Sequence, residues 1–339
     1  MNNLYYLIFL SLLILTLNVY LKKKNFLISE TGDNHQIFTS NTKIPLTGGI
    51  LIYFGVFFNF SENILLLSTL TLLLILGIFS DLKILKSAKK RFTSQIILVI
   101  SYIYFVDITI NDTRLDFLDN FLEINIFNYL FVTFCILIVI NGSNFLDGLN
   151  TIILGYYLIV VFVLLFLNSN NIIEINYLSI ENYLYVLIIA YFLNLFNFLY
   201  LGDSGSYILG FIFSLLLIDI YNSNDYLSPF FIILLLWYPC FENLFSIIRK
   251  TKFNVSALEP DTNHFHQLVF HYLKIKMNFK IIYLNVITAN LINFYNLLIF
   301  CLSLNYVNHT KIQIGLILLN LMIYTVIYFK LFVFRYKKI

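Results

Sequence analysis

Apolar residues occur in long runs along the whole chain, separated by short polar or charged clusters. A helix needs roughly 20 predominantly apolar residues to cross the hydrocarbon core of a bilayer. These runs lack the period-two alternation of barrel strands, so each one predicts a transmembrane helix. The eleven expected helices lie at about 4–21, 45–60, 63–79, 94–110, 125–140, 149–167, 183–200, 206–221, 228–248, 281–303 and 312–333.

This pattern predicts an all-α, polytopic integral membrane helix bundle, with residues 1–339 in a single membrane-embedded domain. The first run is interpreted as a retained helix and not as a signal peptide, because Lys22, Lys23 and Lys24 follow it instead of preceding it. The chain shows no internal repeat and no Pro-rich or Gly-rich linker that would divide it.

The basic residues predict an orientation, because short translocated loops are depleted of Lys and Arg. With the N-terminus outside, all 21 Lys and Arg residues except Arg114 and Lys311 fall on the cytoplasmic side. An even or shifted helix count would destroy this bias. We therefore expect the N-terminus outside and the C-terminus in the cytoplasm.

The composition excludes a soluble globular protein, since 60% of the residues are hydrophobic and only 12% are charged. The net charge of +3 follows from the loop asymmetry and does not indicate nucleic-acid binding. The three cysteines, Cys135, Cys240 and Cys301, lie singly in apolar runs, which fits neither a disulfide framework nor a zinc site.

Four polar segments on the expected cytoplasmic face contain carboxylates, amides or imidazoles at helix ends, where a short basic loop would have been enough to set the membrane orientation. The first is Ser80–Asp81, which ends the third expected helix and leads into a lysine-rich stretch before Gln95. A carboxylate beside cations can hold a metal or accept a proton from a phosphate. An ordinary interfacial loop is the alternative, and the lysines are assigned to orientation.

The second segment, residues 141–150, is predicted to be a polar hairpin between two apolar helices and contains no Lys or Arg. Asn141, Asn144 and Asp147 recur at three-residue spacing, so they can share one helical face. There they could bind a ribose, a base or metal-bound water. The alternative is a tight glycine turn capped by amides.

The third segment, Gly202–Ser206, lies between the seventh and eighth expected helices. Glycines let the backbone approach a ligand, and an aspartate among small hydroxyls suits a magnesium ion that also contacts phosphates. The alternative is a turn followed by a helix cap.

The fourth segment, residues 259–267, lies in the longest cytoplasmic loop and contains His264 and His266. Histidines two positions apart are poorly placed to share a metal without a turn, so phosphate contacts suit them better. A lone histidine is usually a surface residue, but Asp, Asn and two His within six positions favour a functional cluster.

Together the four segments supply acids, amides and imidazoles on one membrane face, without an obvious serine or cysteine nucleophile. This inventory favours phosphate chemistry assisted by a hard metal ion. A phosphorylated lipid would present its head group at this interface, and a nucleotide would arrive from the cytoplasm.

In order and content these segments resemble the polyprenyl-phosphate N-acetylhexosamine-1-phosphate transferases, of the bacterial glycosyltransferase family 4 type and similar to undecaprenyl-phosphate GlcNAc-1-phosphate transferases. The resemblance covers about residues 40–270, and the family's eleven-helix, outside-to-inside topology agrees with the expected one. The matching segments are Ile44–Gly49, Ser80–Asp81, Asn141–Asn150, Gly202–Gly205 and Asp261–Gln267, together with Pro239, Glu242 and Arg249.

The resemblance implies a magnesium-dependent reaction, with Mn²⁺ as an alternative cation. An oxygen of undecaprenyl phosphate attacks the β-phosphorus of a UDP-N-acetylhexosamine, which gives a lipid-linked diphosphosugar and UMP. Such a protein would lie in a bacterial inner or plasma membrane with its active site at the cytoplasmic face. It would initiate a cell-envelope glycan of the cell wall or lipopolysaccharide, and a homodimer is left open.

The resemblance also implies roles for individual residues. Asp81 matches an acid that deprotonates or positions the lipid phosphate, and Asp203 matches the metal-binding aspartate. Asn144 and Asp147 match residues of the nucleotide and metal sites. The expected catalytic residues are Asp81, Asp147 and Asp203, the metal ligands Asp203 and Asn144, and the substrate-binding residues Asn141, Asn144, Asn150, His264, His266, Gly48 and Gly49.

The chain departs from the family pattern at three positions. The family usually has a second aspartate at Ser80, an aspartate at Asn150 and a third histidine at Gln267, so each change removes a charge or a titratable group. The changes point to a subgroup with a different sugar preference. The three remaining carboxylates would suffice for one magnesium ion completed by phosphate and water.

Two other classes of function are compatible with a polar membrane protein. A transporter should carry charges or broken helices near the bilayer midplane, but the expected helix centres here contain almost no acidic or basic residues. A catalytically silent lipid-binding or partner-binding scaffold is the other alternative. The scaffold is disfavoured because Asp147, Asp203 and the histidines are present. An activity assay distinguishes the scaffold from the transferase.

Overall fold

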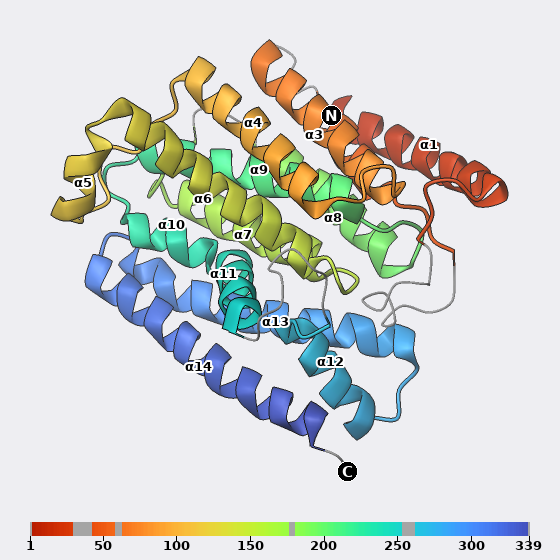
Figure 1. Cartoon of the computed structure of the whole chain (residues 1–339). Helices are drawn as coiled ribbons and strands as arrows, with labels where there is room; N and C mark the ends of the chain where they lie inside the picture. The colour runs from red at the N-terminus through yellow and green to blue at the C-terminus, as the bar shows by residue number, and fades with distance from the viewer. Residues whose placement is uncertain (1, 30–42, 58–62, 176–179, 253–261, 338–339) are drawn as a thin grey trace.

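The computed structural model describes residues 2–29, 43–57, 63–175, 180–252 and 262–337. Within these ranges the regular elements are all helices, and the only β-type pairing is an isolated bridge between Ile28 and Pro45. The helices pack side by side into one bundle (Figure 1). The predicted all-α fold is therefore confirmed for the described part of the chain.

The helices are bounded as follows: α1 Asn2–Lys24, α2 Gly48–Val56, α3 Ile64–Asp81, α4 Ala88–Val106, α5 Asp116–Leu122, α6 Asn125–Leu146, α7 Ile152–Ser169, α8 Ile180–Leu195, α9 Gly202–Asn222, α10 Pro229–Leu235, α11 Trp237–Lys252, α12 Phe265–Lys276, α13 Ile281–Ser303, a 3-10 turn Leu304–Tyr306, and α14 Thr310–Tyr336.

Each of the eleven expected ranges overlaps at least one of these helices. Seven helices (α1, α3, α6, α7, α9, α13 and α14) are long and apolar enough to cross a membrane, and α10 with α11 forms an eighth candidate, bent by 74°. The chain is thus a multi-pass membrane protein. The other three ranges match α2 with 9 residues, α4 with its basic first turn, and α8 with 16 residues, so the count of eleven and the orientation stay predictions.

The hairpin predicted at 141–150 is only partly present, because α6 continues as a helix through Leu146. Polar side chains in this extension find partners inside the bundle. The amide of Asn141 donates to Gln95 Oε1 at 3.1 Å, and the Ser143 and Tyr157 hydroxyls are hydrogen-bonded at 2.5 Å. Because these groups are satisfied within the bundle, the chain turns only after Leu146.

Helix α9 is the centre of the bundle and is buried along nearly its whole length. It packs against α2, α3, α6 and α10, and Figure 1 shows it in the interior of the bundle, behind α4 and α6. Glycine permits the closest of these contacts: a Cβ on Gly77 of α3 would lie 2.2 Å from Ser204 Cα. This close approach brings the end of α3, which carries Ser80 and Asp81, onto the start of α9.

Candidate active site

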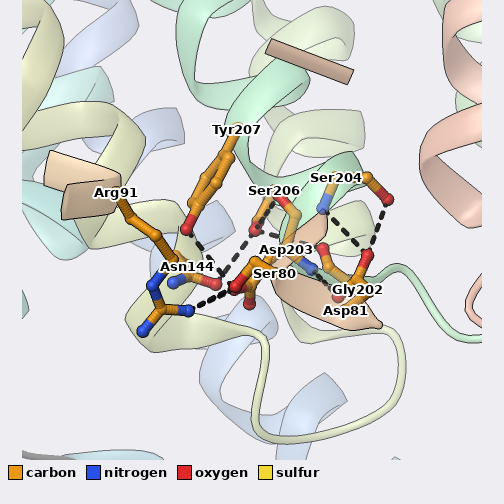
Figure 2. Close-up of polar contacts among 9 residues, drawn as sticks. All are labelled: Ser80, Asp81, Arg91, Asn144, Gly202, Asp203, Ser204, Ser206 and Tyr207. Carbon is orange, nitrogen blue, oxygen red and sulfur yellow. Dashed lines mark hydrogen bonds and ion pairs between the residues drawn. The ribbon is translucent and has the colours of Figure 1, made fainter. Parts of the chain in front are cut away.

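Four helix ends meet where the polar motifs gather: the ends of α3 and α6, and the starts of α4 and α9 (Figure 2). Gly202 makes this junction possible, because it has a left-handed backbone with φ of +71°. A Cβ at this position would also lie 2.7 Å from Asp81 Oδ2. Any other residue would therefore be strained and would displace the Asp81 carboxylate.

The Asp81 carboxylate caps helix α9 from outside. Its Oδ1 accepts the backbone N–H of Asp203 at 2.8 Å, and its Oδ2 accepts the N–H and the hydroxyl of Ser204 at 3.3 and 2.9 Å. The residue that precedes the helix, Leu201, has no capping side chain. Asp81 thus replaces the missing cap at the start of the helix.

The Asp203 carboxylate is the polar centre of the junction. Its Oδ2 forms an ion pair with Arg91 Nη1 at 2.8 Å and accepts hydrogen bonds from the hydroxyls of Ser80 and Tyr207. Ser80 Oγ also accepts a hydrogen bond from Arg91 Nη1. The side chains of Arg91 and Asp203 are 26% and 24% exposed, so both stay accessible to a ligand from solvent.

Helix α6 and the turn after it bring Asn144 and Asp147 to the same place. Asn144 Oδ1 accepts a hydrogen bond of 3.1 Å from Ser206, one turn after Asp203 on α9. Burial raises the pKa of the Asp147 carboxyl well above its usual range, and the carboxylates of Asp203 and Asp81 raise it further, against a hydrogen bond from the Gly202 backbone. The three predicted catalytic aspartates therefore converge.

This donor set fits a magnesium ion in its chemistry. Carboxylate and amide oxygens are the ligands that Mg²⁺ prefers. The pKa of Asp147 is raised first by burial and then by the neighbouring carboxylates, and a bound cation would favour its ionised form. In the part of the chain that the structure describes, no group of three or more His, Cys, Asp or Glu side chains is placed to hold a metal ion. Phosphate oxygens and water would have to supply the remaining ligands.

The two histidines lie beside the turn that follows α6. Their rings stack, with centroids 5.8 Å apart and planes 10° apart, and the His264 ring lies 5.2 Å from the Phe145 ring. Nε2 of His266 faces Gly148, where a Cβ would lie only 2.4 Å away. The structure therefore joins the histidine segment to residues 145–148. Asn144, through Ser206, and Asp147, through the Gly202 backbone, join the end of α6 and the turn after it to the start of α9.

His266 is fully buried, and neither ring nitrogen has a hydrogen-bond partner among the described residues. Burial lowers the pKa of its imidazole to about 3, and the neighbouring His264 lowers it as well. His266 is therefore neutral near pH 7.

The remaining predicted substrate residues make packing contacts. The N–H of Gly48 donates to Tyr200 O at 2.9 Å, and a Cβ on Gly49 would lie 2.5 Å from Ser204 Oγ, so both glycines fit α2 against the start of α9. Asn141 bonds Gln95, one turn deeper in the bundle than Asn144. The Asn150 amide bonds Asn197 Oδ1 at 2.7 Å, which ties the turn before α7 to the end of α8.

Sequence reasoning missed Arg91 as a site residue. Its position in a lysine-rich stretch had an adequate explanation as an orientation signal. The structure places it in the first turn of α4, after the cap Ser87, with its guanidinium turned toward Asp203. The one available signal was helical spacing, because Arg91 lies one turn before the buried Gln95.

The chain is similar to known glycosyl transferases over the region that contains the aspartates. Residues 63–221 match the family model described as glycosyl transferase family 4. The chain is also 26% identical, over 268 residues, to the probable undecaprenyl-phosphate N-acetylglucosaminyl 1-phosphate transferase of Bacillus subtilis (strain 168), with 72% of each chain covered. The family match contains all three aspartates, and the histidine segment lies beyond it.

Proposed function

We propose that this chain, whose residues 63–221 match the glycosyl transferase family 4 model, transfers an N-acetylhexosamine 1-phosphate from a UDP-sugar to a polyprenyl phosphate. The acceptor is most simply undecaprenyl phosphate, and UMP is released. The observation that carries the proposal is the convergence of Asp81, Asp147 and Asp203 with Arg91 at four helix ends. Helix ends lie near a membrane surface, where a lipid phosphate and a soluble nucleotide can both reach one site.

Charge stabilisation is the main task of such a site. The acceptor oxygen of a phosphate monoester is already largely ionised near pH 7, since its second pKa is about 6. A general base is therefore not needed to form the nucleophile. In the reaction a new P–O bond forms at the β-phosphorus, the bond to the α-phosphate breaks, and UMP leaves with the electron pair of that bond.

The individual residues are assigned to this task by their contacts. Asp81 holds the first turn of α9 in place, which orients Asp203 toward the junction. Arg91 contacts Asp203 and Ser80 through Nη1, so the rest of its guanidinium can meet the donor's diphosphate. Mg²⁺ or Mn²⁺ held by Asp203 and Asn144 would neutralise phosphate charge during transfer.

All three departures from the family pattern have structural partners here. The Gln267 side chain accepts the backbone N–H of His264 at 3.2 Å, and the Asn150 amide bonds Asn197. Ser80 bonds both Arg91 and Asp203, so the hydroxyl links the two charged groups. Because each replaced residue is hydrogen-bonded, we propose that the enzyme is active and that its donor preference differs from the family's. We also propose that it lies in a bacterial inner or plasma membrane with the site facing the cytoplasm.

The test is UMP release by the purified protein with undecaprenyl phosphate and a panel of UDP-N-acetylhexosamines, with and without Mg²⁺. We expect release that depends on lipid, donor and magnesium. Failure of folded protein with every donor would reject the transferase and favour a catalytically silent lipid-binding scaffold.

A further inference from the structure

Glu242 is a buried acid that the proposed chemistry has not used. It lies on α11 and is 1% exposed, yet it has three hydrogen-bond donors around it. Its Oε1 is 3.0 Å from His264 Nδ1 and accepts the Phe265 N–H at 3.2 Å, while Oε2 accepts the Tyr324 hydroxyl at 2.6 Å. A buried carboxylate with so complete a set of donors can remain ionised.

The contact with His264 determines the state of that ring. An ionised carboxylate accepts hydrogen bonds and cannot donate one, so Nδ1 of His264 has to carry the proton. Any contact of the ring with a substrate then has to be made through Nε2. Carboxylates that orient a working histidine in this way are a common device in enzyme sites.

Helix α14 holds this pair from the other side. Tyr324 bonds Glu242, Tyr328 donates to Asn263 O at 2.9 Å, and Arg335 Nη2 donates to Thr262 Oγ1 at 2.9 Å. These three residues are spaced by four and seven positions, so they share one helical face. The segment that leads into His264 is thereby fixed to α14, which lies at the edge of the bundle in Figure 1.

We propose that Glu242 is a positioning residue that fixes the ring orientation and tautomer of His264 for contact with the diphosphate of the nucleotide-sugar donor, and that Tyr324 holds Glu242 for this role. The inference rests on the proposed transferase function. It extends the site to α11 and α14, beyond residues 63–221 that match the family model.

The first experiment is a double-mutant cycle on kcat/KM. Glu242→Gln keeps the shape but removes the charge that fixes the tautomer, and we expect a loss of about 10- to 100-fold, as for other residues that orient a working histidine. His264→Asn keeps a donor for Glu242 but lacks Nε2. In the His264→Asn background, Glu242→Gln should therefore have no further effect.

Tyr324→Phe removes one hydrogen bond from Glu242 and should lower kcat/KM by about threefold to tenfold. Tyr295→Phe is the matched control, because Tyr295 donates to Asn320 Oδ1 of α14 at 2.6 Å without touching Glu242. It should leave kcat/KM unchanged. A purely structural role for Glu242 would instead give additive losses in the cycle, or loss of folded protein with normal turnover of the remainder, and either result overturns the proposal.

A second readout needs no turnover, so it separates this inference from the proposed function. In protein labelled with ¹⁵N-histidine, His264→Asn identifies the His264 signal among the five histidines of the chain. We expect the wild-type ring to be protonated at Nδ1, with the tautomer shifting in Glu242→Gln. An Nε2-protonated wild-type ring, or an unchanged tautomer in Glu242→Gln, would refute the positioning role even if UMP is released.

Discussion

Two arginines, one in the first turn of helix α4 and one in the chain beyond its far end, make different kinds of contact. Arg91, in the first turn, pairs with the Asp203 carboxylate through one nitrogen at a partly exposed junction. Arg114, eight residues beyond the other end, donates to Asn308 O, Thr310 Oγ1 and Leu227 O at 2.8 to 2.9 Å. The 19 residues of α4 separate the two ends by roughly 28 Å.

Arg91 lies in the candidate site, whereas Arg114 makes structural contacts. Backbone carbonyls and a hydroxyl use both terminal nitrogens of Arg114 and tie the chain before α10 to the start of α14. Arg91 meets a carboxylate and a hydroxyl that belong to the site motifs. A basic residue therefore indicates a functional site when its partners are polar side chains of the motifs, and a structural role when its partners are mainly backbone carbonyls.

The largest effect is expected from Asp203→Asn, which removes the carboxylate that pairs with Arg91. Turnover should fall by at least about 1000-fold, because the charge that would hold the cation is lost. UMP release at saturating magnesium measures it. The control is Asp219→Asn, about four turns along the same helix, where turnover should be retained. Normal activity in folded Asp203→Asn would remove Asp203 from the catalytic centre.

Arg91→Gln should lower kcat/KM by about 100-fold, since a charged, forked contact to phosphate is lost while the fold is kept. Arg91→Lys retains the charge without the fork and should fall between wild type and Arg91→Gln. Steady-state kinetics with varied donor measure both variants. Wild-type kinetics in Arg91→Gln would reduce the ion pair to a surface contact.

Arg114→Gln should instead lower the free energy of unfolding by about 2 kcal/mol, because hydrogen bonds from a charged donor to several acceptors are lost. Turnover per folded molecule should not change. Denaturant unfolding in detergent, together with UMP release, measures both quantities. A loss of turnover at unchanged stability would contradict the assignment of Arg114 as structural.

The smallest effect is expected from Asn150→Asp, which restores the aspartate usual in the family. The amide of Asn150 donates to Asn197 Oδ1 and to Asn194 O, and a carboxylate can donate to neither. Stability should fall by about 1 kcal/mol, and UMP release should not rise. A gain in turnover would show that position 150 serves the substrate in this chain.

The helices could be predicted because a membrane demands long apolar segments whatever the tertiary packing. Their local form could not, since the 74° bend between α10 and α11 and the continuation of α6 to Leu146 depend on neighbouring helices. Asn141 illustrates this dependence, because its amide donates both to Leu137 O of its own helix and to Gln95 of α4, and the second partner could not be foreseen from the sequence.

The site residues likewise divide into those that local sequence motifs predict and those that only the packing of distant segments reveals. The three aspartates stand in short motifs that carry their own signal, and the structure brings them together. Glu242 and Tyr324 are separated by 82 positions and meet only in the folded bundle. Arg91 was hidden among lysines because sequence alone does not show which member of a basic cluster turns inward.

The central claim is that a phosphosugar, and not the sugar alone, is transferred at the Asp203 junction. The most direct measurement uses a UDP-N-acetylhexosamine labelled with ³²P in the β-phosphate, incubated with purified protein, undecaprenyl phosphate and Mg²⁺. Our account predicts that the label moves to the lipid and that the released UMP is unlabelled. Label that remains on released UDP would contradict the account.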